Sequence, residues 1–387
     1  MRYDAIVIGA GPGGTSAAIT LGMAGRRVLL LEKSRFPREK LCGEFLTPEC
    51  RAIFNRLGVL DRLISAGAAL ISQYNIYSQE GNGIEIPLRW IADGEGEALG
   101  LSRGRMDSIL TDRAREVGVE VREEFSVAAG FRVEDGDGVV EGQHASVKES
   151  FRANLVIDAS GRNGAFSRQL PGQSRQVSLF QGARIFGCKV HLRRIPGMAG
   201  LGELYFFGDG YGGLSDIEGE RSNLCFLTTE KTLLEARGDR EKLLDLTLNT
   251  NPVAKKRLKE AVMAGEWHGT GPITYGRQQK LAGVLAVGDS SAFIDPFTGS
   301  GMLLALTSGE LAGRVVNQHL SVGNRKADEI IADYEVRHRS MFTRRYRAVS
   351  MLRNLAFRPA ARRLMVTILA RQQSLARAVA RSTRMKQ

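Results

Sequence analysis

The stretch AIVIGAGPGG, residues 5–14, decides the fold, because an apolar strand runs directly into a glycine-rich turn. A helix of small residues and a second apolar run follow, and that run ends at Glu32. Gly9 permits the tight turn, Gly11 lets the backbone approach a pyrophosphate, and Gly14 lets the helix pack closely on the strand. The helix N-terminus directs N–H groups toward phosphates, and Glu32 can accept a hydrogen bond from a ribose hydroxyl. The pattern therefore predicts a βαβ unit that binds a dinucleotide.

Length and composition indicate a two-domain protein with ample material for a core. The chain has 387 residues, of which 43% are hydrophobic. No apolar run reaches the ~20 residues that a bilayer-spanning helix needs. The beginning of the chain does not resemble a signal peptide, so we expect a cytoplasmic location. The four cysteines form no CxxC pair, and the sequence predicts neither disulfide bonds nor a metal site.

Positive charge is concentrated near the end of the chain. The formal net charge is +12, while residues 336–387 contain thirteen Arg, one Lys and no Asp or Glu. The remainder of the chain is therefore close to neutral. The basic segment contains no recognisable nucleic-acid-binding motif, so no nucleic-acid partner is predicted.

The basic segment is predicted to be helical, with Pro359 dividing it into two pieces. Two interpretations remain open. A basic amphipathic helix can lie on an anionic membrane surface, which would suit a lipid-like substrate and a location at the inner face of the membrane. Alternatively, the helix docks on the body of the protein, with its arginines solvated or paired with acids. The apolar residues that fall near one face of the second piece are Leu364, Ile368, Leu375 and Val379.

Hydrophobic periodicity divides the rest of the chain into an α/β part and a β-rich part. A hairpin is predicted over residues 70–88, antiparallel strands over 175–230 and a helical stretch over 231–264. The predicted fold combines an α/β Rossmann-type domain that is discontinuous in sequence, an antiparallel β-sheet substrate domain and a basic helical C-terminal region. The expected boundaries are 1–66, 101–174 and 276–330 for the first domain, 67–100 and 175–275 for the second, and 331–387 for the C-terminal region.

Four segments carry a resemblance to a known superfamily. They are FPREKLCGE (residues 36–44), Leu101-Ser102-Arg103 with Asp107 and Leu110, Ile157-Asp158-Ala159-Ser160-Gly161 followed by Ser167-Arg168, and Gly288-Asp289 followed by DPFTGSG (residues 295–301). With these segments the chain resembles the para-hydroxybenzoate hydroxylase-like FAD oxidoreductases over roughly residues 1–330. Within that superfamily it is most similar to the geranylgeranyl reductase family. The resemblance implies FAD as the cofactor, reduced by transiently bound NAD(P)H or by a protein donor.

The resemblance also implies where the flavin binds. Asp289 at a strand end can accept a hydrogen bond from a ribityl hydroxyl, while Gly299 and Gly301 let backbone N–H groups approach the ring. A helix that starts near Gly301 would direct its positive end there and favour the anionic reduced flavin, tuning a cofactor that itself carries the redox chemistry. Arg103 is expected near the FAD phosphates. The predicted cofactor-binding residues are Gly9, Gly11, Pro12, Gly13, Gly14, Glu32, Lys33, Cys42, Arg103, Gly288, Asp289, Pro296, Gly299, Ser300, Gly301 and Met302.

Three reactions and one non-enzymatic role are open. A monooxygenase would hydroxylate an apolar aromatic or polyketide-type compound with NAD(P)H and oxygen in a dry pocket. A reductase would add hydride and a proton to an alkene bond of a prenyl lipid or quinone, with Cys42 and Glu44 as candidate catalytic residues. A flavin-dependent halogenase is less favoured, because such enzymes need a lysine and none occurs between Lys40 and Lys148. A pure electron carrier would need no substrate domain.

The predicted substrate sheet departs from that of the prenyl reductases. Their Tyr-x-Trp-x-Phe-Pro segment corresponds here to YGGLSD, which begins at Tyr211 and lacks the Trp and the Phe-Pro. Tyr205, Phe207 and Tyr211 are predicted to line the substrate pocket, although aromatic residues in strands also form plain core. His191 and His268 are assigned no role, because a lone histidine in a β-rich region is usually a satisfied polar group.

Overall fold

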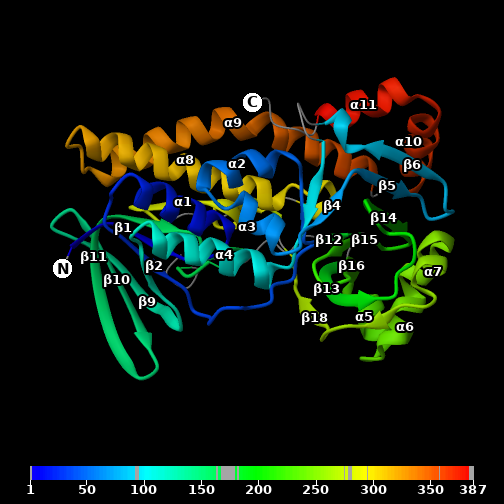
Figure 1. Ribbon diagram of the computed structural model, residues 1–387, viewed down its shortest axis with the longest axis horizontal. Coiled ribbons are helices and arrows are strands. Elements are labelled where there is room, and N and C mark those ends of the chain that lie inside the picture. Colours follow the sequence, from blue (N-terminus) through cyan, green and yellow to red (C-terminus); the bar gives the residue numbers. More distant parts are fainter. Residues whose placement is uncertain are drawn as a thin grey trace.

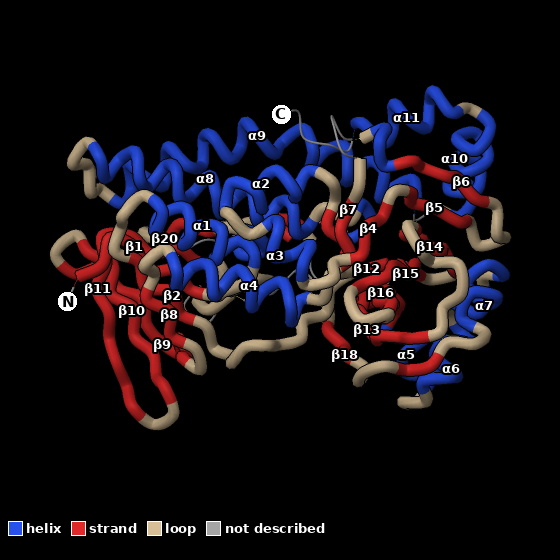
Figure 2. Tube along the Cα trace, viewed as in Figure 1, coloured by secondary structure: helices blue, strands red, loops and turns tan. Residues whose placement is uncertain are grey.

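In the computed structural model an α/β part and a β-sheet part lie side by side, and the C-terminal helices run along both (Figure 1). Helices gather on one side of the first sheet and at the outer edge of the second (Figure 2). The structure describes residues 2–91, 96–162, 164–166, 179–180, 183–273, 275–277, 281–293, 295–356 and 358–382.

The first sheet is mostly parallel and leads into the glycine-rich turn. Its strand order is β8-β2-β1-β11-β10-β9, and β20 also pairs with β11. The second half of β11 pairs in parallel with β1 and β20, while its first half pairs antiparallel with β10. Strands buried on both faces are continuous apolar runs, as in β2. The strands are β1 (Arg2–Ile8), β2 (Val28–Leu31), β8 (Glu120–Arg122), β9 (Phe125–Glu134), β10 (Asp137–His144), β11 (Val147–Asp158) and β20 (Val284–Ala286).

Two helices that are far apart in sequence pack on each other against this sheet. They are α1 (Pro12–Met23) and α8 (Gly301–Ser321), and both contribute to the cluster that contains the alternate β1 residues Ala5 and Val7. A Cβ at Gly309 would lie 2.0 Å from the backbone oxygen of Gly13, so α8 can approach α1 this closely only with glycine there. The other helices of this part are α2 (Glu49–Leu57), α3 (Leu60–Ser65) and α4 (Arg103–Glu116).

The second sheet has the order β12-β13-β16-β15-β14-β5-β6, with β17 and β18 also paired to β13. The hairpin predicted over 70–88 is confirmed as the antiparallel pair β5–β6. A small sheet, β3-β7-β4, lies between the two parts of the chain. The strands are β3 (Phe45–Leu46), β4 (Ala69–Ile71), β5 (Gln73–Tyr77), β6 (Gly83–Pro87), β7 (Ala98–Gly100), β12 (Leu179–Phe180), β13 (Ala183–Arg193), β14 (Leu201–Phe207), β15 (Gly210–Ile217), β16 (Arg221–Thr229), β17 (Val262–Met263) and β18 (His268–Thr270).

The helical stretch predicted over 231–264 is three short helices rather than a long one. Asp239 and Asn251 each begin a new helix, because their side chains accept hydrogen bonds from the first free backbone N–H groups. The stretch also ends early, since β17 begins at Val262. The helices α5 (Glu230–Ala236), α6 (Arg240–Leu246) and α7 (Pro252–Leu258) pack on one face of the second sheet.

The C-terminal segment is helical, and Pro359 begins a new helix as predicted. Helix α9 (Ala327–Ala356) returns alongside α8, and α10 (Pro359–Arg371) and α11 (Gln373–Ser382) pack against β6 (Figure 1). The apolar side chains that face the body differ from the predicted stripe: Val366 and Leu369 are buried, whereas Ile368 is 38% exposed. Tertiary packing, not the stripe, sets the orientation of these helices. Among the described residues, no helix combines the length and the apolar character needed to cross a membrane.

Candidate functional site

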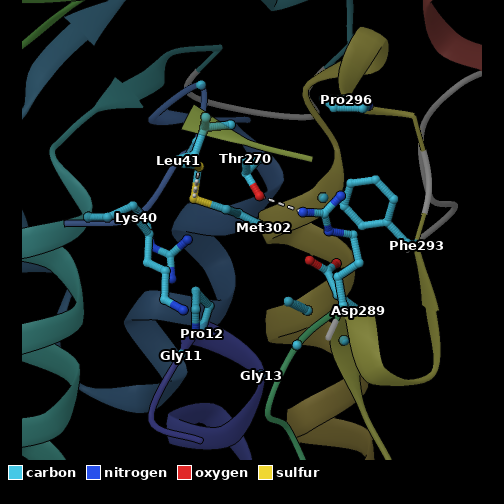
Figure 3. A pocket seen from close by; sticks show the side chains of 18 of the residues that line it. Gly11, Pro12, Gly13, Lys40, Leu41, Thr270, Asp289, Phe293, Pro296 and Met302 are labelled. Atoms are coloured by element: carbon cyan, nitrogen blue, oxygen red, sulfur yellow. Dashed lines mark hydrogen bonds between the residues drawn. The ribbon is translucent and has the colours of Figure 1, made fainter. Parts of the chain in front are cut away.

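A cavity of about 840 Å³ opens where the two sheets meet, beyond the carboxyl ends of β1, β11 and β20. This is the edge at which open α/β sheets bind ligands. The glycine-rich turn lies at one end of the view in Figure 3 and Pro296 at the other. Of the sixteen predicted cofactor-binding residues, all but Gly14 and Ser300 line the cavity. From the third resemblance segment Ser160 and Gly161 also line it, while Ser167 and Arg168 lie outside the described residues.

Two glycines of the glycine-rich turn, Gly9 and Gly14, leave no room for a side chain. Gly9 adopts a φ of +99°, and a Cβ there would lie 2.5 Å from the backbone oxygen of Ala159. A Cβ at Gly14 would lie 1.9 Å from the oxygen of Gly9, so Gly14 permits the packing of α1 on the turn rather than lining the cavity. Gly11 is the N-cap of α1. Because glycine has no side chain that could accept a hydrogen bond, the first backbone N–H groups of α1 remain available to an anion.

Glu32, at the end of β2, is a buried carboxylate held in place by N–H groups. Its oxygens accept hydrogen bonds from Ala10 N at 2.9 Å and from Ser34 N at 3.1 Å. Burial raises the pKa of Glu32, but Arg38 and these N–H groups outweigh burial and leave the pKa below its ordinary value. Since each carboxylate oxygen has a second lone pair and Glu32 lines the cavity, an acceptor for a ribose hydroxyl is in place.

Arg103 is held rigidly beside the glycine-rich turn. Asp107 binds its guanidinium at two points, Nε to Oδ1 at 3.0 Å and Nη2 to Oδ2 at 2.8 Å. A Cβ placed on Gly11 would lie 3.7 Å from Nη2 of Arg103. A pre-organised cation therefore lies where the phosphates are expected.

Asp289, just after β20, carries its carboxylate into the cavity. Burial raises its pKa to about 6, although Arg103, Arg162 and Lys40 act in the opposite direction. Among the described residues, none donates a hydrogen bond to this carboxylate. Arg162 lies above the ring of Phe293, and its guanidinium donates instead to Thr270 Oγ1 at 2.6 Å, the dashed contact in Figure 3. A buried acceptor without a protein partner fits a hydroxyl-bearing ligand chain.

The loop that precedes α8 forms the wall beside Asp289. Pro296, Gly299, Gly301 and Met302 line the cavity, and Gly299 adopts a φ of +63° that favours glycine. Ser300 is fully buried and is the N-cap of α8 without a side-chain cap bond, so it supports the loop from behind. The N-terminus of α8 thus opens on the same cavity as that of α1. Two positive helix ends converge there, which favours a ligand that carries negative charge.

Glu44, a predicted catalytic residue, is the centre of a buried ionic cluster. Its Oε1 lies 2.6 Å from Lys189 Nζ and its Oε2 lies 2.7 Å from His191 Nε2. Lys189 also binds Glu39 at 2.7 Å, and the two carboxylates more than offset the effect of burial, so the pKa of Lys189 is raised. Oε1 of Glu44 further accepts the backbone N–H of Arg103 at 2.8 Å. These contacts make Glu44 a structural tie between β13 and α4.

No sequence pattern assigns His191 a role or predicts Lys189 beside it. Glu39, Glu44 and His191 bring three metal-ligand atoms within 4.8 Å of one another. The ammonium group of Lys189 lies between the two carboxylates, however, and supplies their positive charge. The cluster is therefore a salt bridge that joins the two sheets through the segment 38–45.

Cys42, the other predicted catalytic residue, lines the cavity and contacts the first turn of α8. Its Sγ lies 3.7 Å from Met302 Sδ and 3.4 Å from the backbone nitrogen of Glu44. Burial raises the pKa of the thiol, with Arg103 acting against that shift. Cys42 is consequently a neutral thiol at pH 7, able to donate a proton and a poor nucleophile.

The predicted substrate-pocket residues divide between the two faces of the second sheet. Tyr211 lines the cavity, but Tyr205 and Phe207 do not. Because side chains alternate along a strand, Tyr205 and Phe207 point toward helices α5 to α7, where both are fully buried. For these two residues the prediction was wrong, and Leu204 of the same strand lines the cavity instead.

Several cavity residues could not be recognised in the sequence. They come from strands β15 and β16, from the segment around β18 and from the residues that precede the flavin loop, and nothing in their spacing relates them to the glycine-rich turn. The cavity-lining residues of this kind are Gly213, Cys225, Leu227, His268, Thr270, Ile273 and Phe293.

Comparison with known proteins assigns this site. Residues 2–191 match the family model described as an FAD binding domain. This match agrees with the motifs by which the chain resembles the para-hydroxybenzoate hydroxylase-like FAD-dependent oxidoreductases. It is 28% identical to a flavin-dependent halogenase of Armillaria mellea, over 89% of this chain and 73% of the halogenase. It is also 28% identical to a digeranylgeranylglycerophospholipid reductase of Methanosarcina mazei, over 87% of this chain and 81% of the reductase.

This FAD-dependent oxidoreductase shares its fold with the flavin-dependent brominase Bmp2. The two structures superpose with a TM-score of 0.78 at 20% identity, over 99% of this chain and 94% of the brominase. FAD is the cofactor, and the cavity fits it. The glycine-rich turn and Arg103 suit the diphosphate, Glu32 suits the adenosine ribose, and Asp289, which has no hydrogen-bond donor among the described residues, suits the ribityl chain.

Replacing Asp289 with Asn is expected to stabilise the flavin-free protein and to weaken FAD binding. A raised acid pKa means that the ionised form is disfavoured in the fold, so the stabilisation is full above about pH 6 and disappears below about pH 4. A shift of about two pKa units corresponds to roughly 3 kcal/mol at most. Loss of a charged acceptor should weaken FAD binding roughly tenfold or more. Urea unfolding between pH 4 and 8 and FAD titration check both parts; unchanged FAD affinity would contradict the assignment.

Proposed function

We propose that this oxidoreductase is a monooxygenase that hydroxylates an apolar, ring-bearing compound, with NAD(P)H as the reductant and oxygen as the second substrate. The observation that carries the proposal is the open wall at Gly213. A Cβ on Gly213 would meet nothing closer than the backbone oxygens of Cys225 and Glu203 at 3.9 Å. This is the position that corresponds to the Trp of the prenyl reductases, so the chamber has space where their segment has an indole.

Part of the chamber wall around Gly213 is apolar. Leu204, Leu227 and Ile273 contribute to its wall. The hydroxyl of Tyr211 already donates to Asp295 at 2.6 Å, and burial raises the pKa of Tyr211 well above its ordinary value. These residues exclude water and orient an apolar ring without taking part in proton transfer.

The chain contributes position and electrostatics. When bound, FAD supplies the redox chemistry, either by activating oxygen or by delivering hydride. The α8 N-terminus and the loop before it would present positive potential to the ring system, and Cys42 lines the cavity beside Met302.

Reduction of an alkene bond is the second candidate, and the Cys42 thiol favours it. Reduction needs a proton donor near the flavin, and burial keeps this thiol neutral. Halogenation ranks third, although a halogenase is among the relatives. The lysines that line the cavity within the described residues are Lys33 and Lys40, and Lys40 lies near the glycine-rich turn rather than in the apolar chamber (Figure 3).

Product analysis distinguishes the three reactions. The FAD-loaded enzyme is incubated with NADPH and oxygen-18 gas, with an alkyl-substituted phenol and, separately, with a prenylated quinone. We expect the phenol to gain one labelled oxygen atom, detected by mass spectrometry. Gain of two hydrogens by the quinone without oxygen would instead establish the reductase, and a halide-dependent product would establish the halogenase.

The Gly213→Phe variant tests the chamber itself. Filling the open wall should lower kcat/KM for the ring substrate roughly tenfold or more, because the substrate is displaced from its reacting position. FAD binding should not change, since Gly213 lies in the second sheet. Gly208→Phe is the matched control, because Gly208 is exposed and has no atom within 4 Å of its Cβ position. Equal activity of both variants with the wild type would exclude Gly213 from the substrate site.

A further inference from the structure

Helix α9 reaches the wall of the flavin site with two arginines. We propose that Arg353 and Arg345 are positioning residues that hold the loop 295–301 in the shape required for flavin binding. Both belong to the basic C-terminal segment, which lies beyond the residues matched to the FAD-binding family. The proposal rests on FAD as the cofactor and not on which reaction follows.

Asp295 is the anchor of the loop. Its side chain is 1% exposed, and its Oδ1 accepts hydrogen bonds from Tyr211 Oη at 2.6 Å and from the backbone N of Phe297 at 3.0 Å. Its Oδ2 accepts the Nε of Arg353 at 2.8 Å. One buried carboxylate thus joins α9, the first residues of the loop and strand β15 of the chamber. A buried carboxylate depends strongly on its cation.

Arg353 is itself fixed by an aromatic ring. Its guanidinium carbon lies 4.3 Å from the centroid of Tyr275, and burial raises the pKa of Tyr275 well above its ordinary value, so the ring stays neutral. The arrangement limits the directions in which the guanidinium can donate, and it keeps Nε directed at Asp295.

The far end of the loop has a second attachment. Arg345 is 3% exposed, and its Nη2 donates to Ser300 Oγ at 2.7 Å. Ser300 directly precedes α8, whose first residues Gly301 and Met302 line the cavity. The two arginines lie eight residues apart, about two helical turns, and therefore on one face of α9. That face spans the loop from its beginning to its end.

The Arg353→Met variant tests this inference, with Arg347→Met as the matched control. Arg347 is exposed on the same helix and makes no ion pair within the described residues. We expect the Kd for FAD to rise about tenfold in Arg353→Met. In the flavin-free protein, amide hydrogen exchange over residues 296–301 should accelerate relative to that over α1. Arg353→Lys should recover part of both effects, because it restores a cation at Asp295.

The outcome that overturns the proposal is a Kd and an exchange pattern in Arg353→Met equal to those of Arg347→Met. If Arg353→Met does not fold, Asp295→Asn gives the same test, because it keeps the shape of the side chain and removes the charge. Exchange is measured without flavin, so a failure of the proposed hydroxylation leaves this result intact.

A second, independent observation concerns the outer face of the C-terminal helices. We infer that this face binds an anionic membrane surface. Within the described residues, six exposed arginines on or next to α9, α10 and α11 have no acidic partner, and the same helices carry exposed apolar side chains. The arginines are Arg339, Arg344, Arg347, Arg358, Arg371 and Arg377, and the apolar residues are Met341, Met351, Leu355, Ile368 and Leu375.

Charge complementarity favours an anionic membrane as the partner of this surface. Residues 336–387 contain no acid to neutralise the arginines internally, and interspersed apolar side chains suit the boundary between headgroups and acyl chains. An apolar substrate dissolved in a membrane would then be accessible to the enzyme at the inner face of that membrane.

Vesicle co-sedimentation of the FAD-loaded enzyme tests this surface. We expect binding to phosphatidylglycerol vesicles, release by high salt, and little binding to phosphatidylcholine vesicles. The variant R344Q/R347Q/R358Q should bind at least about tenfold more weakly, while the control R193Q/R237Q/R240Q, which removes exposed arginines of the second part, should bind normally. Absence of binding to anionic vesicles would overturn the inference and would leave an acidic protein as the occupant.

Discussion

The close approach of three backbones at the glycine-rich turn is the constraint on which the rest of the structure depends. Gly9 lies against the loop after β11, Gly14 against Gly9, and Gly309 of α8 against Gly13. Any Cβ at these contacts would separate α1 from the turn or from α8. Their contact brings the N-termini of α1 and α8 to one cavity, although the two helices begin almost 300 residues apart. The diphosphate end and the ring end of the flavin site are therefore fixed by the same packing.

Two buried carboxylates connect this core to the rest of the chain. Glu44 joins the segment 38–45 to Lys189 and His191 of the second sheet, and Asp295 joins the flavin loop to Tyr211 and Arg353. Buried ion pairs contribute little net stability compared with apolar packing, but loss of one partner is costly, by roughly 3–5 kcal/mol. Such pairs consequently fix the relative position of elements more than they stabilise the fold. Both occur at the cavity wall, where position matters most for a cofactor and its substrate.

Much of the cofactor site could be predicted from the sequence because it depends on local rules. The order of strand, glycines, helix and Glu32 specifies a phosphate turn without any tertiary information. The chamber could not be predicted in the same way. The prediction of Tyr205 and Phe207 as pocket residues required knowing which face of β14 the helices cover, and that depends on the packing of residues 230–258. The Lys189–Glu44 and Arg353–Asp295 pairs join residues 145 and 58 positions apart, and no pattern marks them as partners.

The C-terminal segment shows what can be predicted from composition and what cannot. Its charge and its helical character are evident from the sequence, and Pro359 begins α10 as expected. Which residues face inward depends on the surfaces of β6 and α8, so the expected stripe did not identify them.

A comparison of FAD with FMN binding tests the central claim most directly. The account predicts one FAD per chain and much weaker binding of FMN, because the glycine-rich turn, Arg103 and Glu32 would hold the half of FAD that FMN lacks. Equal affinity for FMN and FAD, or no FAD binding, would contradict it.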